Sequence, residues 1–531
     1  MAEKATDTPQ NPGPVPKDWV PGLIENLRFD LPAGFILFLI ALPLSLGIAI
    51  ASGAPPIAGV ITAVIGGVIG ALISGSHVTI NGAAAGLIAI VYGAVNGLGF
   101  DPATGDVDLI RGFRAALAVG VVCGIIQIGM GLLKLGKMTN IFPLNVVHGM
   151  LAGIGIIIMA KQVHLAVGVD FSGGMIATIA AIPASFANMV PSVALIGGIS
   201  LGLMILWPRL GRIAQFVPAP LAVVIVAIGL SKALSVPDAF LVSVPTNIAD
   251  AYLSPDWSQV ATPLFWKFVV TYVFVASLES LLTAAAMDKM DPWKRRSDMN
   301  RELIGKGAAN TLSSFVGGLP MIAEVVRSSA NIMNGARTRW ANFFHGVFLA
   351  VAVVAIPQLL NMIPLAALAG MLVFIGFRLA HPKEFIHAAK TGNEEVFYMA
   401  VTAVLVVVED LLIGVIAGFV LALVINAVRG VRGVKAPTEI TDAGEQVTLK
   451  LRGAHGFLNF LSLRGVLDDL PPGKALTLDL SEVRYIDHTV HEQLHDFEGE
   501  YARTGGSVRV IGKDRLKSLA ESHVAALRAT S

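Results

Sequence analysis

Long apolar runs recur through most of this chain and constrain its fold more than any other feature. A helix needs about 20 apolar residues to cross the hydrocarbon core of a bilayer. Only 14% of the residues are charged, against roughly 25% in an average soluble domain. The sequence therefore predicts a polytopic α-helical membrane protein. The runs are residues 33–52, 56–74, 112–133, 144–160, 192–207, 217–234, 264–286, 341–356, 362–377 and 396–428.

The membrane segments can be counted from the same runs. Residues 396–428 are long enough for two spans, and Glu409 and Asp410 mark the break between them. Two more stretches, after Asn81 and after Pro320, are apolar but short and interrupted by glycine. With these pieces included, the chain has about 14 membrane segments.

Charged residues divide the connections between the runs into two kinds. Four connections are basic, whereas those between them carry aspartates or no charge. By the positive-inside rule the basic side faces the cytoplasm. We therefore expect an integral protein of a bacterial inner or plasma membrane, with residues 1–30 and the C-terminus in the cytoplasm. The basic connections are residues 134–140, 207–213, 287–306 and 376–396.

The two halves of the apolar region resemble each other. Each has two full spans followed by a short apolar piece that polar residues introduce, SGSHVTINGAAAG at 74–86 and VGGLPMIAEVVRSSAN at 316–331. Such pieces at corresponding places in two halves are typical of the binding site of a secondary transporter. The pattern predicts a transmembrane domain over 31–430, built as 7+7 inverted repeats at 31–235 and 260–430.

Arg327 places a full positive charge in the second of these pieces. If a half-helix begins near Met321, its free N–H groups and those of a half-helix at 81–86 face each other and make a positive pocket that suits an anion. Two other interpretations stay open: Arg327 pairs with Glu324, three residues before it, or its charged head reaches the surface. The predicted binding residues are Asn81, Gly82, Ala83, Ala84, Glu324, Val325, Val326, Arg327 and Ser328.

Glu279 is the second ionisable residue in an otherwise apolar span, with Thr283 one helical turn after it. A buried carboxyl group either binds a proton or requires a cation beside it. Both properties suit coupling of transport to a proton or a sodium ion. The alternative is a carboxyl group that hydrogen bonds to neighbouring helices.

The composition changes after about residue 435. Residues 446–453, 474–483 and 507–512 have the pattern of strands, and residues 457–470, 488–505 and 514–529 have the pattern of helices. Alternating strands and helices predict a small cytosolic α/β domain over 437–531.

The stretch HEQLH (491–495) matches the zinc-peptidase motif H-E-x-x-H, with His488 one turn earlier. The motif fixes only three positions, and a catalytic zinc also needs a further ligand and an open position beside a cleft. We therefore expect no enzyme, no metal and no cofactor, and keep a pH- or metal-sensing role as an alternative. The net charge of +1 gives no reason to expect nucleic acid.

Five motifs resemble those of the SulP sulfate-permease family of solute-carrier anion transporters, over nearly the whole chain. They include the first-span signature, the ninth-span pattern, the tenth-span serine–arginine motif and the last-span pattern. The fifth resembles the signature turn of a STAS domain. In that order they are residues 30–60, 300–320, 326–338, 409–423 and 478–489.

The resemblance implies a core domain that moves against a gate domain, usually in a homodimer embedded in membrane lipid. It places the anion beside Arg327 between the third and tenth half-helices, with Leu44 and Ser45 of the first span nearby. It also places Glu279 on an acidic position linked to cation coupling. This chain departs from the family at Leu44, at Asn81-Gly82, at Glu324 and Val326, and at His488, which replaces the phosphorylatable serine of the STAS turn.

The function expected is secondary active transport of a small inorganic anion, bicarbonate or sulfate, with a proton or sodium ion as partner. The extra carboxylate of Glu324 beside the site favours a small anion. Two alternatives remain: an anion exchanger or dicarboxylate transporter, and an anion-sensing receptor that signals through the STAS domain.

Overall fold

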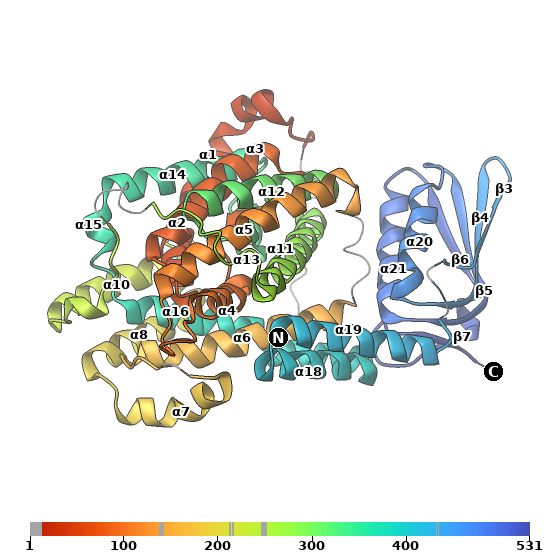
Figure 1. Ribbon diagram of the computed structural model, residues 1–531. Helices are drawn as coiled ribbons and strands as arrows, with labels where there is room; N and C mark the ends of the chain where they lie inside the picture. The colour runs from red at the N-terminus through yellow and green to blue at the C-terminus, as the bar shows by residue number, and fades with distance from the viewer. Residues whose placement is uncertain are drawn as a thin grey trace. The chain divides into compact units, whose positions relative to one another are not determined.

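A computed structural model describes residues 13–136, 143–171, 173–211, 214, 217–245, 252–431, 433 and 435–530. The chain forms two compact units (Figure 1). The first comprises Met1–Gly136 and Gly155–Arg378, and the second comprises Lys137–Ile154 and Leu379–Ser531.

The first unit is helical and holds the two interrupted pieces. Its elements are α1 (Trp19–Ala51), α2 (Pro56–Ile65), η1 (Gly66–Gly70), α3 (Ala71–Ile73), β1 (Asn81–Gly82), η2 (Ala85–Leu87), α4 (Ile88–Gly99), α5 (Leu109–Leu132), the second half of α6 (Leu144–Ala166), α7 (Met175–Ala187), α8 (Pro191–Leu206), α10 (Ala219–Ala233), α11 (Pro263–Met290), α12 (Met299–Phe315), β2 (Ile322–Ala323), α13 (Val325–Met333), α14 (Trp340–Ala355), α15 (Pro357–Leu360) and α16 (Leu365–Leu379).

Capping residues set the starts of several helices. The carboxylate of Asp298 accepts hydrogen bonds from the N–H groups of Asn300 and Arg301 at 3.0 Å, so α12 begins at Met299. The sequence prediction that 287–306 is a loop is therefore wrong for its last residues, which include Lys306. Glycines then let α12 approach α5: a Cβ on Gly307 would lie 2.5 Å from the carbonyl oxygen of Gly124.

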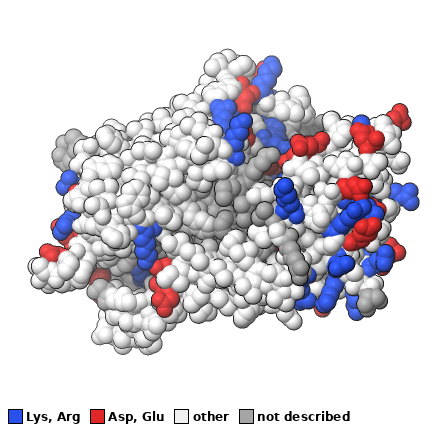
Figure 2. Space-filling model, turned by 45° about the vertical axis from the view of Figure 1, so that its right-hand side comes forward, with Lys and Arg blue, Asp and Glu red and all other residues white. Residues whose placement is uncertain are grey.

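Eight of the described helices are long and apolar enough to cross a membrane, and four shorter ones are also apolar. This confirms the membrane-protein prediction, while the count of 14 segments stays a prediction. In Figure 2 charged side chains are sparse over the helical first unit and gather mainly over the α/β region of the second unit. The predicted break at Glu409 and Asp410 is confirmed, because Asp410 caps the helix that follows it.

The second unit joins apolar helices to an α/β fold. Its helical elements are the first half of α6, then α17 (Pro382–Thr391), α18 (Asn393–Val408), α19 (Leu411–Val428), α20 (Phe457–Asp468) and α21 (His488–Ala502). Its strands form a six-stranded sheet of order β3-β4-β5-β8-β7, with β6 beside β5. They are β3 (Thr438–Asp442), β4 (Gln446–His455), β5 (Ala475–Ile486), β6 (Ser507–Ile511), β7 (Leu516–Ser518) and β8 (Leu527–Ala529).

The α/β region confirms most of the predicted elements and corrects one. Strands β4, β5 and β6 are parallel, and their inward leucines pack under α20 and α21. The predicted helix at 514–529 is wrong, because this segment forms β7 and β8, which pair antiparallel from Leu516↔Ala529 to Ser518↔Leu527. Its helical spacing of apolar residues is overridden by burial of Leu516 and Leu527 in the sheet core.

Two histidines at the start of α21, of which His491 belongs to the H-E-x-x-H stretch, hydrogen bond to this final segment. Nδ1 of His488 donates to the carbonyl oxygen of Val524 at 2.9 Å, and Nδ1 of His491 donates to that of Ala525 at 2.7 Å. The ring of His495 instead packs edge-on against the ring of His523. Among the described residues, no cluster of three His, Cys, Asp or Glu side chains has metal-binding geometry.

We expect His491→Ala to lower the unfolding free energy by about 1 kcal/mol, the usual net value of one hydrogen bond. We also expect the purified protein to carry no stoichiometric zinc. Metal analysis and chemical unfolding test both, with His495→Ala, which removes an exposed ring, as the control. Bound zinc together with a peptidase activity that Glu492→Gln removes would contradict this structural role.

Candidate functional site

The two interrupted pieces meet in a short antiparallel sheet. Strand β1 pairs with β2 in the register Asn81↔Ala323 and Gly82↔Ile322. Helix α4 follows β1 through η2, α13 follows β2, and both α4 and α13 contact α11. Because the strands are antiparallel, the two segments of the chain leave the sheet at opposite ends. Both half-helices therefore start at this sheet.

The extended stretch before α13 has its backbone hydrogen bonds supplied by side chains, as non-helical backbone in a membrane requires. Asn310 accepts from the N–H of Met321 at 2.6 Å and donates to its carbonyl oxygen at 3.2 Å. The carbonyl oxygen of Leu319 accepts from Thr62 and Ser313. The half-helix therefore begins at Val325 instead of near Met321, and Arg327 lies in its first turn.

The guanidinium of Arg327 is fully buried, so the surface interpretation is wrong. Its Nε forms an ion pair with the carboxylate of Glu324, and its Nη2 donates to the carbonyl oxygen of Ala83. A Cβ on Gly82 would lie 2.9 Å from Nη1. Arg327 thus reaches from α13 across to the chain between β1 and η2, and its pairing with Glu324, one of the two other interpretations, is present.

Some of the predicted binding residues around Arg327 are buried, and others are exposed. Ser328 is buried and accepts a hydrogen bond from the N–H of Ile80 at 2.9 Å, so it fixes β1. Val325 and Val326 are nearly half exposed. Ala84 is buried and precedes η2 in an extended conformation.

Asn81 contacts a buried ion pair that the sequence analysis missed. Its side-chain oxygen contacts Nζ of Lys306, which lies 2.7 Å from the carboxylate of Glu302. Both charged side chains are fully buried, and Glu302 also accepts from the N–H of Gly75 at 3.0 Å. The sequence does carry a signal for this pair: Glu302 and Lys306 have opposite charges and are four residues apart, so on a helix they lie on the same face.

Leu44 and Ser45 of α1 are buried, and α1 contacts both α4 and α13. The hydroxyl group of Ser45 has no hydrogen-bond partner within the described ranges, and no hydrogen bond there joins it to Arg327. His345 on α14 was also missed. It is fully buried, and both of its ring nitrogens lack a partner among described residues.

Glu279 lies directly against the start of the first half-helix. A Cβ on Gly86 would meet both carboxylate oxygens of Glu279. One of those oxygens, Oε1, has no hydrogen-bond partner in the part of the chain that the structure describes. Thr283 is buried one turn later, and Ser280 accepts from the N–H of Ala323 at 3.2 Å. The Glu279 carboxylate therefore lies at the start of the half-helix that follows β1.

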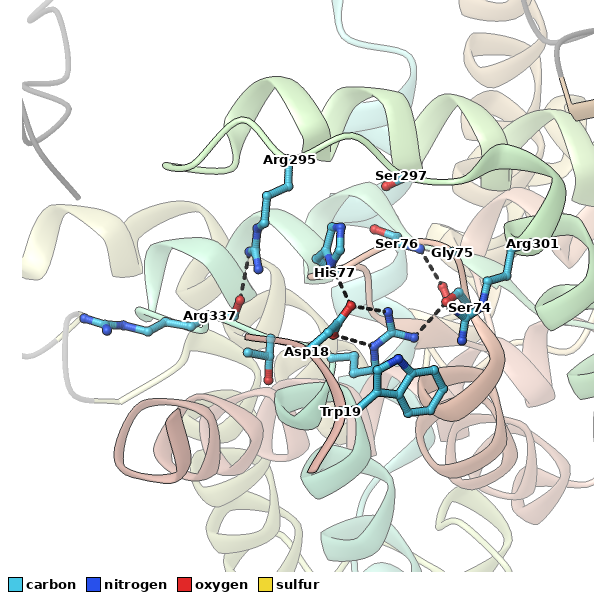
Figure 3. Close-up of polar contacts among 12 residues, drawn as sticks. Asp18, Trp19, Ser74, Gly75, Ser76, His77, Arg295, Ser297, Arg301 and Arg337 are labelled. Carbon is cyan, nitrogen blue, oxygen red and sulfur yellow. Dashed lines mark hydrogen bonds and ion pairs between the residues drawn. The ribbon is translucent and has the colours of Figure 1, made fainter. Parts of the chain in front are cut away.

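A polar cluster fixes the loop before β1 to the chain before α1 (Figure 3). Asp18 pairs with Arg339 through two hydrogen bonds of 3.0 Å, and Arg339 donates to the carbonyl oxygen of Ser74 at 2.9 Å. Burial raises the pKa of Asp18, but hydrogen bonds from His77 and Arg339 outweigh it and hold that pKa well below its usual range. The Trp19 ring lies against Arg339, 5.0 Å from its guanidinium carbon.

The model of the sulfate permease family matches residues 27–402. YvdB of Bacillus subtilis, to which sulfate transport has been attributed, is 26% identical over 92% of each chain. The bicarbonate transporter BicA of Synechocystis is 27% identical over 93% of this chain and 91% of its own. The murine anion transporter Slc26a9 is similar in structure, with a TM-score of 0.66 at 15% identity over 93% of this chain and 86% of its own.

Proposed function

The chain belongs to the sulfate permease family, and from that premise we propose that it is a secondary active transporter of a small inorganic anion, bicarbonate or sulfate. The anion crosses by alternating access together with a proton or a sodium ion. The observation that carries the proposal is the buried guanidinium of Arg327 at the first turn of α13, between the starts of two half-helices. Helix starts and a guanidinium both attract an anion.

The arrangement around Arg327 supports a small anion. Glu324 balances the charge of Arg327, so an incoming anion competes with a carboxylate. A monoanion meets less repulsion from Glu324 than a dianion does. We therefore expect bicarbonate to be preferred over sulfate.

The cation belongs at Glu279 in this proposal, with Thr283 one turn away. Its carboxylate lies against Gly86, at the half-helix that follows β1. A bound cation there offsets the charge of the anion as both cross. The homodimer, the cytoplasmic termini and the STAS role of residues 437–531 stay predictions from the resemblance.

Uptake into proteoliposomes tests the proposal. Purified protein is reconstituted, and uptake of labelled bicarbonate and of labelled sulfate is measured with an inward sodium gradient, an inward proton gradient, or unlabelled anion inside. We expect concentrative uptake with one cation gradient, and bicarbonate to outcompete sulfate. Uptake that occurs only when the proteoliposomes contain unlabelled anion would establish exchange. Anion binding without uptake would favour the receptor alternative.

A further inference from the structure

Helix α1 is longer than a bilayer requires. It has 33 residues, which make a helix of about 50 Å, whereas the hydrocarbon core is about 30 Å thick. Its continuous apolar run starts near Leu31. The turns before Leu31 therefore lie at the edge of the bilayer, at the level of the lipid headgroups.

These turns present an apolar stripe to the outside of the unit. The side chains of Val20, Ile24, Leu27, Leu31 and Phe35 are all exposed, Ile24 by 74%. Spacings of three and four residues place them on one face of the helix. The stripe continues without a break from the headgroup level into the hydrocarbon region, as lipid acyl chains do.

Two arginines without an acidic partner flank one ring beside this stripe. The guanidinium carbon of Arg28 lies 4.7 Å from the centre of the Phe29 ring, and that of Arg337 lies 3.5 Å from it. Within the described residues, neither guanidinium has a hydrogen bond or an ion pair. Figure 3 shows the Arg337 side chain extending away from the other labelled groups.

The nearby carboxylates have other hydrogen-bond or ion-pair partners. Asp291 binds Arg295 through two hydrogen bonds of 2.9 Å, and Glu25 pairs with Lys17 at 2.6 Å. Asp30 is buried and accepts from the backbone N–H of Arg337 at 2.7 Å, which fixes where Arg337 leaves the chain. Neither guanidinium of the arginine pair therefore binds one of these carboxylates.

We propose that Arg28 and Arg337 bind the phosphate of an anionic phospholipid whose acyl chains lie along Leu31 and Phe35. Arginine offers a planar set of donors that matches a phosphate. Ile24 and Leu31 lie four residues before and three after Arg28, so the phosphate and the apolar stripe share one side of α1. That continuity favours a lipid over a soluble phosphate. The lipid bridges α1 to the connection between α13 and α14.

The test uses the purified full chain in a neutral detergent. Phosphatidylglycerol is titrated against phosphatidylcholine, with the Tm and the lipids retained in native mass spectrometry as readouts. We expect phosphatidylglycerol to raise the Tm and to be retained. The double variant Arg28→Gln/Arg337→Gln should lose most of both effects. The matched control Arg209→Gln/Lys232→Gln, which removes two exposed charges elsewhere in the unit, should keep them.

Four results would overturn the proposal. The double variant could retain phosphatidylglycerol as the wild type does, or phosphatidylcholine could stabilise equally well. Glycerol phosphate alone could give the same rise in Tm, which would make the site one for soluble phosphates. If the double variant does not fold, Arg28→Gln decides the matter, because its side chain is exposed, and unchanged lipid retention in it would contradict the proposal.

Discussion

Arg327→Ala is expected to weaken anion binding by about 30-fold or more, because truncating one partner of a buried charge interaction costs about 2–5 kcal/mol. The same change removes the only cation that an ion pair joins to Glu324 among described residues. An uncompensated buried charge costs about 3–5 kcal/mol. We therefore expect Arg327→Ala to lose stability as well as binding, measured as the Tm and by calorimetric titration of bicarbonate.

Two further variants separate recognition from stability. Glu324→Ala together with Arg327→Ala removes both charges, and should recover most of the stability without recovering anion binding. Glu324→Gln alone leaves Arg327 without its competing carboxylate and should tighten anion binding. A double variant that binds bicarbonate with wild-type affinity would mean that Arg327 only holds α13 against the Ala83 carbonyl group.

Glu279→Gln is expected to abolish cation-driven accumulation of the anion while leaving exchange of internal for external anion in place. An anion moving inward alone against a negative-inside potential faces about 2.3 kcal/mol per charge per 100 mV. A cation carried at Glu279 cancels that charge, and glutamine cannot replace it. Fluxes of anion, protons and sodium are measured in the same proteoliposomes. Accumulation with unchanged cation dependence would make Glu279 a packing residue.

A glycine substitution tests the same carboxylate without changing it. In Gly86→Ala the new Cβ lies too close to both carboxylate oxygens of Glu279 for them to stay in place, so the carboxylate must move. We expect coupling to be lost as in Glu279→Gln. Gly93→Ala on the same helix is the matched control, because its Cβ would make an ordinary contact of 3.5 Å with Phe268. If the two glycine variants show the same cation coupling, the contact between Gly86 and Glu279 does not affect coupling.

Much of the fold could be predicted because a membrane makes hydrophobicity decisive. Spans such as α5 and α11 can be predicted from the length of their apolar runs. The break at Asp410 can be predicted because a charged side chain interrupts the run and can cap the next helix. The meeting of 74–86 with 316–331 could be predicted from their similar places in two halves. Each of these inferences depends on local sequence or on internal repetition.

Features set by distant partners could not be predicted. The start of α13 moves to Val325 because Asn310, on another helix, binds the backbone of Met321. Lys306 was assigned to a loop because its charge suggested water, whereas Glu302 compensates it inside the unit. The segment 514–529 has helical spacing but forms strands because Leu516 and Leu527 are buried in the sheet core. His488 and His491 bind carbonyl groups in the turn between these strands.

The pairing of β1 with β2 also constrains how the protein is made. The N–H of Ile80 depends on Ser328, which the ribosome adds 248 residues later, and the carbonyl oxygen of Ile80 depends on the N–H of Glu324. Until then the first interrupted piece has backbone groups that lipid cannot satisfy. Until the second half has been synthesised, these backbone groups therefore need hydrogen-bond partners from water or from another protein, such as the insertion machinery. The final folding step is late and joins the two halves together.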